Sequence, residues 1–164
     1  MADIRHRVGI SAPQERVFAA LSTKGGLADW WTRDVDGEAT PGSTLRFFFG
    51  TPDPSGVMEV VDTTPSHRVS WRCVAGPDDW VGTSLNFELK PSEFETVDES
   101  VHEAGKETVK ETVLLFTHGE WREPTEFMHH CSTKWAYFLL GLKASLEGGA
   151  SIAFPNDMPI SSWG

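Results

Sequence analysis

The longest amphipathic segment of this sequence reads PTEFMHHCSTKWAYFLLGLKASL, residues 124–146. Its apolar residues recur every three or four positions, which is the spacing of one face of an α-helix. They are Phe127, Met128, Cys131, Trp135, Phe138, Leu139, Leu142 and Leu146. Pro124 stands near the first helical position and Gly148-Gly149 follows the end, as is typical of helix boundaries. About 25 residues at a rise of 1.5 Å give a helix roughly 37 Å long, enough to cross a whole sheet.

The region before this helix predicts an antiparallel β-meander. Apolar and polar residues alternate there in short runs, and Pro, Gly, Asp and Ser separate the runs as in tight turns. The expected strands cover residues 45–49, 57–61, 69–74, 80–89 and 107–118. Residues 93–106 are acidic and polar, which predicts a long exposed hairpin end or a mobile loop between the last two strands.

The N-terminal region predicts one strand followed by two short helices. Residues 3–10 alternate between apolar and polar side chains, as in a half-buried strand. Ser11-Ala12-Pro13-Gln14 is typical of a helix start, with a capping serine and a proline in the first turn. Lys24-Gly25-Gly26 should end this helix, and a second is expected from Leu27 to Trp31.

This order of elements predicts an α+β fold with a curved antiparallel sheet of about six or seven strands around the C-terminal helix. A helix is only about 10 Å wide, so it cannot cover a wide flat sheet. We therefore expect the sheet to curl around the long helix. If the curl is incomplete, a cavity remains between them, and the seven Trp and ten Phe of the chain would line it.

A series of short motifs carries a family resemblance. The motifs are Ser11-Ala12-Pro13, Val17-Phe18, Trp30-Trp31, Pro41-Gly42-Ser43, Arg46-Phe47, Val57-Met58-Glu59-Val60, residues 65–71 and 83–89, Thr117-His118-Gly119, Trp121, and residues 135–143. Their order along residues 3–148 is similar to that of the SRPBCC (START-like) superfamily. More narrowly, it resembles the branch named for activators of the heat-shock protein 90 ATPase.

The resemblance implies a helix-grip (START or Bet v-like) fold over residues 1–149, with a deep pocket under the C-terminal helix. It implies no single activity, because lipid carriers, hormone receptors, cyclases and chaperone activators share this superfamily. Eukaryotic activators carry a further N-terminal chaperone-binding domain, for which we expect no room in 164 residues. The apolar residues of the tail, residues 150–164, predict that it packs on the domain or on a partner subunit, which leaves a homodimer open.

Composition narrows the classes of partner. The net charge of −10 should repel phosphate backbones and anionic lipid surfaces, so we expect neither nucleic acid nor membrane as a partner. The N-terminus shows no apolar signal core, and no run approaches the length of a membrane span. Cys73 and Cys131 are the only cysteines, and we expect two free thiols in a cytoplasmic protein.

Few residues suggest chemistry. His118, His129, His130 and Cys131 are metal-ligand types, but adjacent helical residues point about 100° apart, so we expect no metal and no cofactor. Cys131 with His118 has the residue types of a nucleophilic pair. However, a cysteine on an apolar helix stripe is usually an inert buried thiol. We therefore assign no catalytic residue.

The predicted cavity wall combines strand aromatics with the helix stripe. It comprises Trp30, Arg46, Phe47, Glu59, Trp71, Cys73, Trp80, Leu85, Phe87, Leu114, Phe116, His118, Cys131, Trp135 and Leu139. Arg46 and Glu59 could orient a polar ligand head if they face inward, although a one-residue change of register turns both to solvent, and this alternative is favoured. The aromatic residues could equally form a filled core, since protein interiors are close-packed.

These observations predict a cytoplasmic domain that binds or carries a small apolar ligand without a cofactor. An enzyme is less favoured; it would be a cyclase or hydrolase that uses the same pocket, and perturbed pKa values inside the pocket would support it. The other alternative is an interaction module like the chaperone-ATPase activators. An exposed apolar patch over a filled interior would support that alternative.

Overall fold

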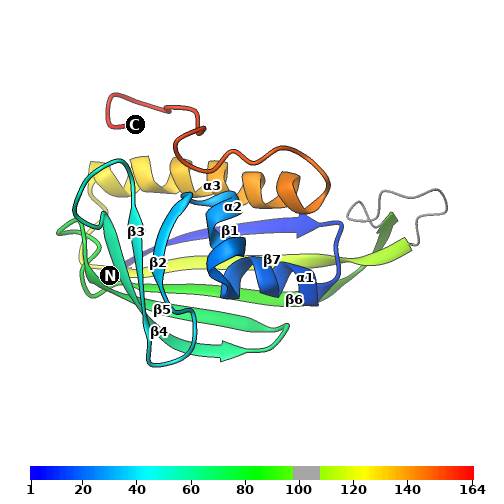
Figure 1. Ribbon diagram of the computed structural model, residues 1–164. Helices are drawn as coiled ribbons and strands as arrows, with labels where there is room; N and C mark the ends of the chain where they lie inside the picture. The colour runs from blue at the N-terminus through cyan, green and yellow to red at the C-terminus, as the bar shows by residue number, and fades with distance from the viewer. Residues whose placement is uncertain (98–107) are drawn as a thin grey trace.

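The computed structural model describes residues 1–97 and 108–164, which form seven strands and three helices (Figure 1). In chain order the elements are β1 (Ala2–Ile10), α1 (Gln14–Ser22), α2 (Lys24–Trp30), β2 (Asp34–Gly37), β3 (Thr44–Phe48), β4 (Gly56–Thr64), β5 (Arg68–Ala75), β6 (Ser84–Val97), β7 (Thr108–Trp121) and α3 (Glu126–Leu146).

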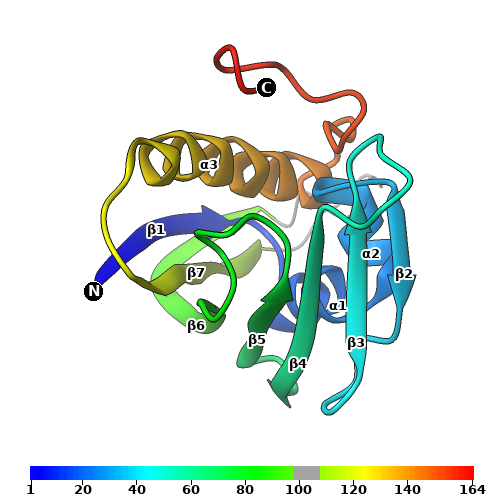
Figure 2. The same ribbon diagram turned by 90° about the vertical axis from the view of Figure 1, so that its left-hand side faces the viewer.

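The described strands form one antiparallel sheet in the order β1-β7-β6-β5-β4-β3-β2. β1 and β2 lie at opposite edges, so the connection through α1 and α2 spans the width of the sheet. The sheet is strongly curved, and α3 lies across its concave face (Figure 2). The predicted α+β helix-grip fold, with a curved sheet around the C-terminal helix, is therefore confirmed.

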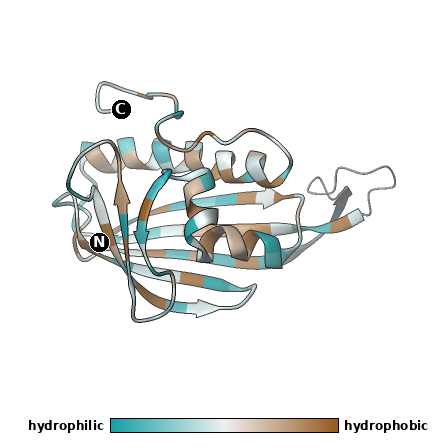
Figure 3. Ribbon diagram, viewed as in Figure 1, coloured by the Kyte–Doolittle hydropathy of each residue, from teal (hydrophilic) through white to brown (hydrophobic). Residues whose placement is uncertain are grey.

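Hydrophobic and hydrophilic residues alternate along the strands (Figure 3), and successive side chains of a strand point to opposite faces of the sheet. Phe47 in β3 and Met58 in β4 are fully buried. Arg46 precedes Phe47 by one position, and Glu59 follows Met58 by one position. Both charged side chains therefore point to the convex face. Arg46 donates a hydrogen bond there to Asp36, over 2.8 Å. The register that buries the apolar neighbours turns both charges to solvent, which is the alternative that the sequence favours for Arg46 and Glu59.

The two short helices divide at Thr23 rather than at the glycines. α1 ends at Ser22, and Thr23 caps α2 by accepting a hydrogen bond from the Gly26 backbone N–H over 3.0 Å. Gly25 and Gly26 therefore lie inside α2, which begins three residues earlier than predicted. A side-chain cap satisfies a backbone donor that would otherwise lack a partner, and this offsets the low helix propensity of glycine.

Two strands differ from their predicted extent. β2 was not expected, because it has only four residues and its alternating Asp34 and Asp36 give no apolar run; as an edge strand it is defined by its pairing with β3. β6 begins at Ser84, because the backbone N–H groups of Trp80 and Val81 both bond to the Pro77 carbonyl in a turn. Trp80 therefore leaves the line of the strand.

The acidic segment is partly strand. β6 continues to Val97 and β7 begins at Thr108, with Glu95 paired to Lys110, so residues 93–97 belong to a hairpin arm. The remainder of the predicted exposed loop, residues 98–107, lies outside the described residues.

Aromatic rings fill the interior between the sheet and α3. The ring centroids of Trp71 and Phe87 lie 5.0 Å apart, and those of Phe116 and Trp135 lie 4.7 Å apart. Trp30 donates its indole N–H to the Ala20 carbonyl over 2.9 Å. Aromatic pairs of this kind stabilise a fold by about 0.5–1.5 kcal/mol each beyond the burial of their area.

The tail, residues 150–164, folds back over α3 (Figure 1). Phe154 donates its backbone N–H to the Trp31 carbonyl over 2.9 Å, and its own carbonyl accepts from the Arg33 N–H over 3.1 Å. Ile152 packs directly over Gly141, where an added Cβ would overlap the Ile152 side chain. Glycine at this point of the helix therefore has a packing reason, since it allows the tail to approach α3.

Candidate functional site

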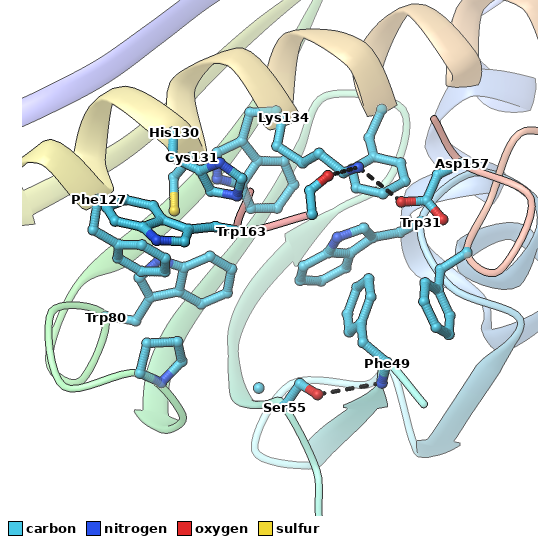
Figure 4. A pocket seen from close by; sticks show the side chains of 16 residues that line it. Trp31, Phe49, Ser55, Trp80, Phe127, His130, Cys131, Lys134, Asp157 and Trp163 are labelled. Carbon is cyan, nitrogen blue, oxygen red and sulfur yellow. Dashed lines mark hydrogen bonds and ion pairs between the residues drawn. The ribbon is translucent and has the colours of Figure 1, made fainter. Parts of the chain in front are cut away.

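A cavity of about 370 Å³ lies beside α3, and half of its sixteen lining residues are Trp or Phe (Figure 4). From α3 come Phe127, His130, Cys131, Lys134, Trp135 and Phe138. The C-cap of α2, the first residue of β4 and the loops contribute Trp31, Phe49, Ser55, Gly56, Pro77 and Trp80. The tail contributes Phe154, Asp157, Trp163 and Gly164. The size and the apolar lining match those of small-molecule sites.

Three tryptophans form the inner wall. The rings of Trp80 and Trp135 are stacked, with centroids 6.1 Å apart and an interplanar angle of 17°. Trp31 lies 4.9 Å from Trp135 and 6.5 Å from Trp80. Each ring comes from a different element, so the wall exists only when the β5–β6 loop, α3 and the end of α2 are assembled.

A buried hydrogen-bond chain holds two of these rings. Trp135 donates its indole N–H to His118 Nδ1 over 3.1 Å, which leaves the proton of the neutral ring on Nε2. Nε2 therefore donates to Thr83 Oγ1 over 2.8 Å, and Thr83 donates to the Trp80 carbonyl over 2.6 Å. Burial lowers the pKa of His118 from 6.5 to about 3. His118 is thus a neutral positioning residue behind the pocket wall.

Cys131 is not an activated nucleophile. Burial raises the pKa of its thiol to about 12, so the reactive thiolate is disfavoured. Both ring nitrogens of His118 are already bonded to Thr83 and Trp135. The two residues therefore do not form the nucleophilic pair that their types allow.

Lys134 carries the positive charge of the pocket wall. Its Nζ lies 2.8 Å from Asp157 Oδ2, and the two side chains are only 16% and 12% exposed. Nζ also donates to the backbone oxygens of Met158 and Gly164, over 2.8 and 2.9 Å. The ammonium group joins the middle of α3 to the far part of the tail.

Most of the predicted wall residues lie in the packed core. Of the fifteen, Trp80, Cys131 and Trp135 line the cavity. Ten others are at most 1% exposed in the core: Trp30, Phe47, Trp71, Cys73, Leu85, Phe87, Leu114, Phe116, His118 and Leu139. They do not line this cavity, because their rings and branches pack against one another under α3.

Sequence reasoning missed the outer half of the pocket. Trp31 faces the cavity and Trp30 does not. Adjacent helical residues point about 100° apart, so the two side chains cannot both face it. Lys134 offered a signal, because it is a charge three residues after Cys131 on an apolar stripe. Phe154 and Trp163 are large apolar residues in the tail, but nothing local showed where they pack.

The described residues contain no group of three or more His, Cys, Asp or Glu side chains that could hold a metal ion. His130 instead bonds through Nδ1 to Ser161 Oγ over 3.0 Å. The expected absence of a metal stays a prediction. Of the described helices, none has both the length and the apolar character needed to cross a bilayer.

The family described as activator of Hsp90 ATPase homolog 1-like protein matches residues 11–147. The chain belongs to this family. The resemblance in the sequence is therefore confirmed. Membership in the activator of Hsp90 ATPase homolog 1-like family is consistent with a ligand-binding domain and specifies neither a ligand nor an activity. Among curated proteins, none matches the chain.

Solved structures agree with the family. The Aha1 dimer from Colwellia psychrerythraea is 39% identical, with a TM-score of 0.73 over 91% of this chain and 98% of that one. Protein SSP2350 from Staphylococcus saprophyticus is 19% identical, with a TM-score of 0.67 over 93% and 97%. CalU16 from Micromonospora echinospora is 17% identical, with a TM-score of 0.65 over 91% and 76%. The last two show the fold alone.

Proposed function

We propose that the chain binds a small, mostly apolar molecule in the cavity beside α3. The observation that carries this proposal is the aromatic lining of a cavity of about 370 Å³. Apolar ligands are bound mainly by removing their surface from water, and flat aromatic walls provide large contact areas for this. Two free cysteines, Cys73 and Cys131, support a cytoplasmic location for the domain.

The packed wall also supports binding rather than chemistry. The stacked pair Trp80–Trp135 is held from behind by His118 and Thr83, so the surface offered to a ligand is preorganised. Inside the cavity, Cys131 has a raised pKa, which opposes nucleophilic attack. A hydrolase that used Cys131 as its nucleophile would need a lowered thiol pKa instead.

Gly56 allows a direct steric test of the site. It starts β4 and lines the cavity, and a Cβ added there would meet Trp80 at 3.7 Å, which is an ordinary contact. Gly56→Val should therefore fill pocket volume without a backbone clash and lower the affinity for a neutral apolar probe about tenfold or more. The measurement is a fluorescence titration with N-phenyl-1-naphthylamine, with unfolding followed in parallel.

Gly56→Ala is the matched control. Its single methyl group fits the observed space, so it should change the affinity much less than valine does. Equal probe binding by wild type and Gly56→Val, with both proteins folded, would show that the probe binds elsewhere and would contradict the proposed site.

A second candidate function is association with a protein partner. The specific observation is the 39% identity to a protein whose structure is that of a dimer. In this chain, Leu140, Met158 and Trp163 are 57%, 58% and 53% exposed on α3 and the tail. We propose a homodimer as the form of this association, with a chaperone as the alternative that the family name suggests. Analytical ultracentrifugation tests the first, since a homodimer gives twice the monomer mass.

A further inference from the structure

Lys134 occupies an unusual place for a cation. Its side chain is 16% exposed in a wall made largely of aromatic rings, and its Nζ lies 5.4 Å from the ring centroid of Phe138. A buried ammonium group is costly unless it is paired with an anion and hydrogen-bonded. Among the side chains of the described residues that line the cavity, those of Lys134 and Asp157 are the two that carry a full charge at neutral pH, and they face each other (Figure 4).

All three oxygens that contact the ammonium group belong to the tail. They are Asp157 Oδ2, the Met158 carbonyl oxygen and the backbone oxygen of Gly164, at 2.8, 2.8 and 2.9 Å. An ammonium group has three donors, so these oxygens satisfy it completely. The tail oxygens thus take up all three donors of the Lys134 ammonium group, which forms part of the wall of the ligand cavity.

The tail is attached by two different kinds of contact. Its first part is fixed by backbone hydrogen bonds between Phe154 and residues 31–33, and Ala153 is fully buried. Its last part is exposed at Met158 and Trp163. It is held through Lys134, through hydrogen bonds to the Tyr137 hydroxyl and to His130, and through contacts of the Trp163 ring with the rings of Phe127 and His130. The last part could therefore separate from α3 while the first part stays in place.

We propose that the natural ligand carries one anionic group, such as a carboxylate, and that this group replaces Asp157 at Lys134. The aromatic wall would hold the apolar body, and the anion would take the position of the Asp157 side chain. Ligand binding would then release residues 157–164 from α3. This inference rests on the proposed function, and it adds the chemical class of the ligand and the role of the tail.

Lys134 should attract an anion on a protein whose overall charge repels anions. With a net charge of −10, the surface as a whole repels anions. An anion should bind favourably at Lys134 because this site is partly shielded from water. A charge pair is stronger there than in water. Asp157 is an internal competitor of the same chemical type, so removing its charge should favour external anions.

Two probes with the same aromatic skeleton test the inference. 8-Anilino-1-naphthalenesulfonate is anionic, and N-phenyl-1-naphthylamine is its neutral counterpart. Asp157→Asn keeps a hydrogen-bond acceptor near Lys134 and removes the charge. We expect it to raise the affinity for the anionic probe about five- to tenfold and to change that for the neutral probe less than twofold. Lys134→Met should lower the affinity for the anionic probe by a similar factor and spare the neutral one.

Asp36→Asn is the matched control. It also removes one carboxylate from an ion pair, that with Arg46 on the convex face, and changes the net charge equally. It should leave the affinities for both probes unchanged. An equal gain for the anionic probe in Asp36→Asn and Asp157→Asn would reduce the effect to overall charge and overturn the inference.

Hydrogen exchange of the wild-type chain gives an independent measurement. Saturation with the anionic probe should speed amide exchange in residues 157–164, and saturation with the neutral probe should not. Unchanged or slower exchange there with the anionic probe would overturn the displacement of Asp157. Failure of the neutral probe to bind would instead contradict the proposed function itself, so the two failures are distinguishable.

Discussion

Replacing Trp135 with alanine should lower the free energy of unfolding by about 3–5 kcal/mol, the usual cost of removing a buried large aromatic side chain. Trp135 is 3% exposed and contacts Phe116 and Trp31 at centroid distances of 4.7 and 4.9 Å. Its removal also leaves His118 Nδ1 without its donor in the core, which adds to the loss. The same change destroys one wall of the proposed pocket.

Urea unfolding followed by circular dichroism measures this loss without depending on tryptophan emission. His129→Ala is the matched control on the same helix, because the His129 side chain is exposed. It should change the free energy of unfolding by less than about 0.5 kcal/mol. A loss below about 1 kcal/mol for Trp135→Ala would mean that the ring is not packed as described.

His118 should make the folded state sensitive to acid. Burial lowers its pKa from 6.5 to about 3 in the folded chain, so the unfolded chain binds a proton there first as the pH falls. The stabilisation is complete above pH 6.5 and is lost between about 6.5 and 3. The expected slope is about 1.4 kcal/mol of unfolding free energy for each pH unit in that range.

The variant His118→Gln isolates this contribution. Glutamine can accept from Trp135 and donate to Thr83, but it does not titrate. Between pH 7 and pH 5 the wild type should lose about 2 kcal/mol more than the variant, because the other titratable groups are common to both. Parallel pH profiles for the two proteins would show that His118 is protonated in the folded state as readily as in the unfolded one.

The fold was predictable because its signals are local. The stripe from Phe127 to Leu146 repeats at helical spacing, and the strands alternate with a period of two, so each element shows its buried face without reference to the others. Boundaries were less predictable where a single hydrogen bond decides them. Thr23 capping α2 and the turn at Pro77 that displaces Trp80 are such cases.

The pocket was predictable only in part. Trp135 and Cys131 were expected on its wall because they lie on the helix face that must meet the sheet. Trp71 and Phe116 share the same apolar pattern, yet they fill the core. Pattern shows that a side chain faces inward, whereas packing decides whether it meets another side chain or an empty volume.

The sequence by itself determined the curved sheet, the long covering helix, the family and an aromatic interior. Tertiary structure alone decided where space remains and which charges meet there. Lys134 and Asp157 come from a helix and an irregular tail that share no periodicity, so their pairing depends on Ile152 packing over Gly141 and on Phe154 joining Trp31. Such contacts follow from how completed elements fit together, because a short-range pattern carries no information on the volume left between distant surfaces.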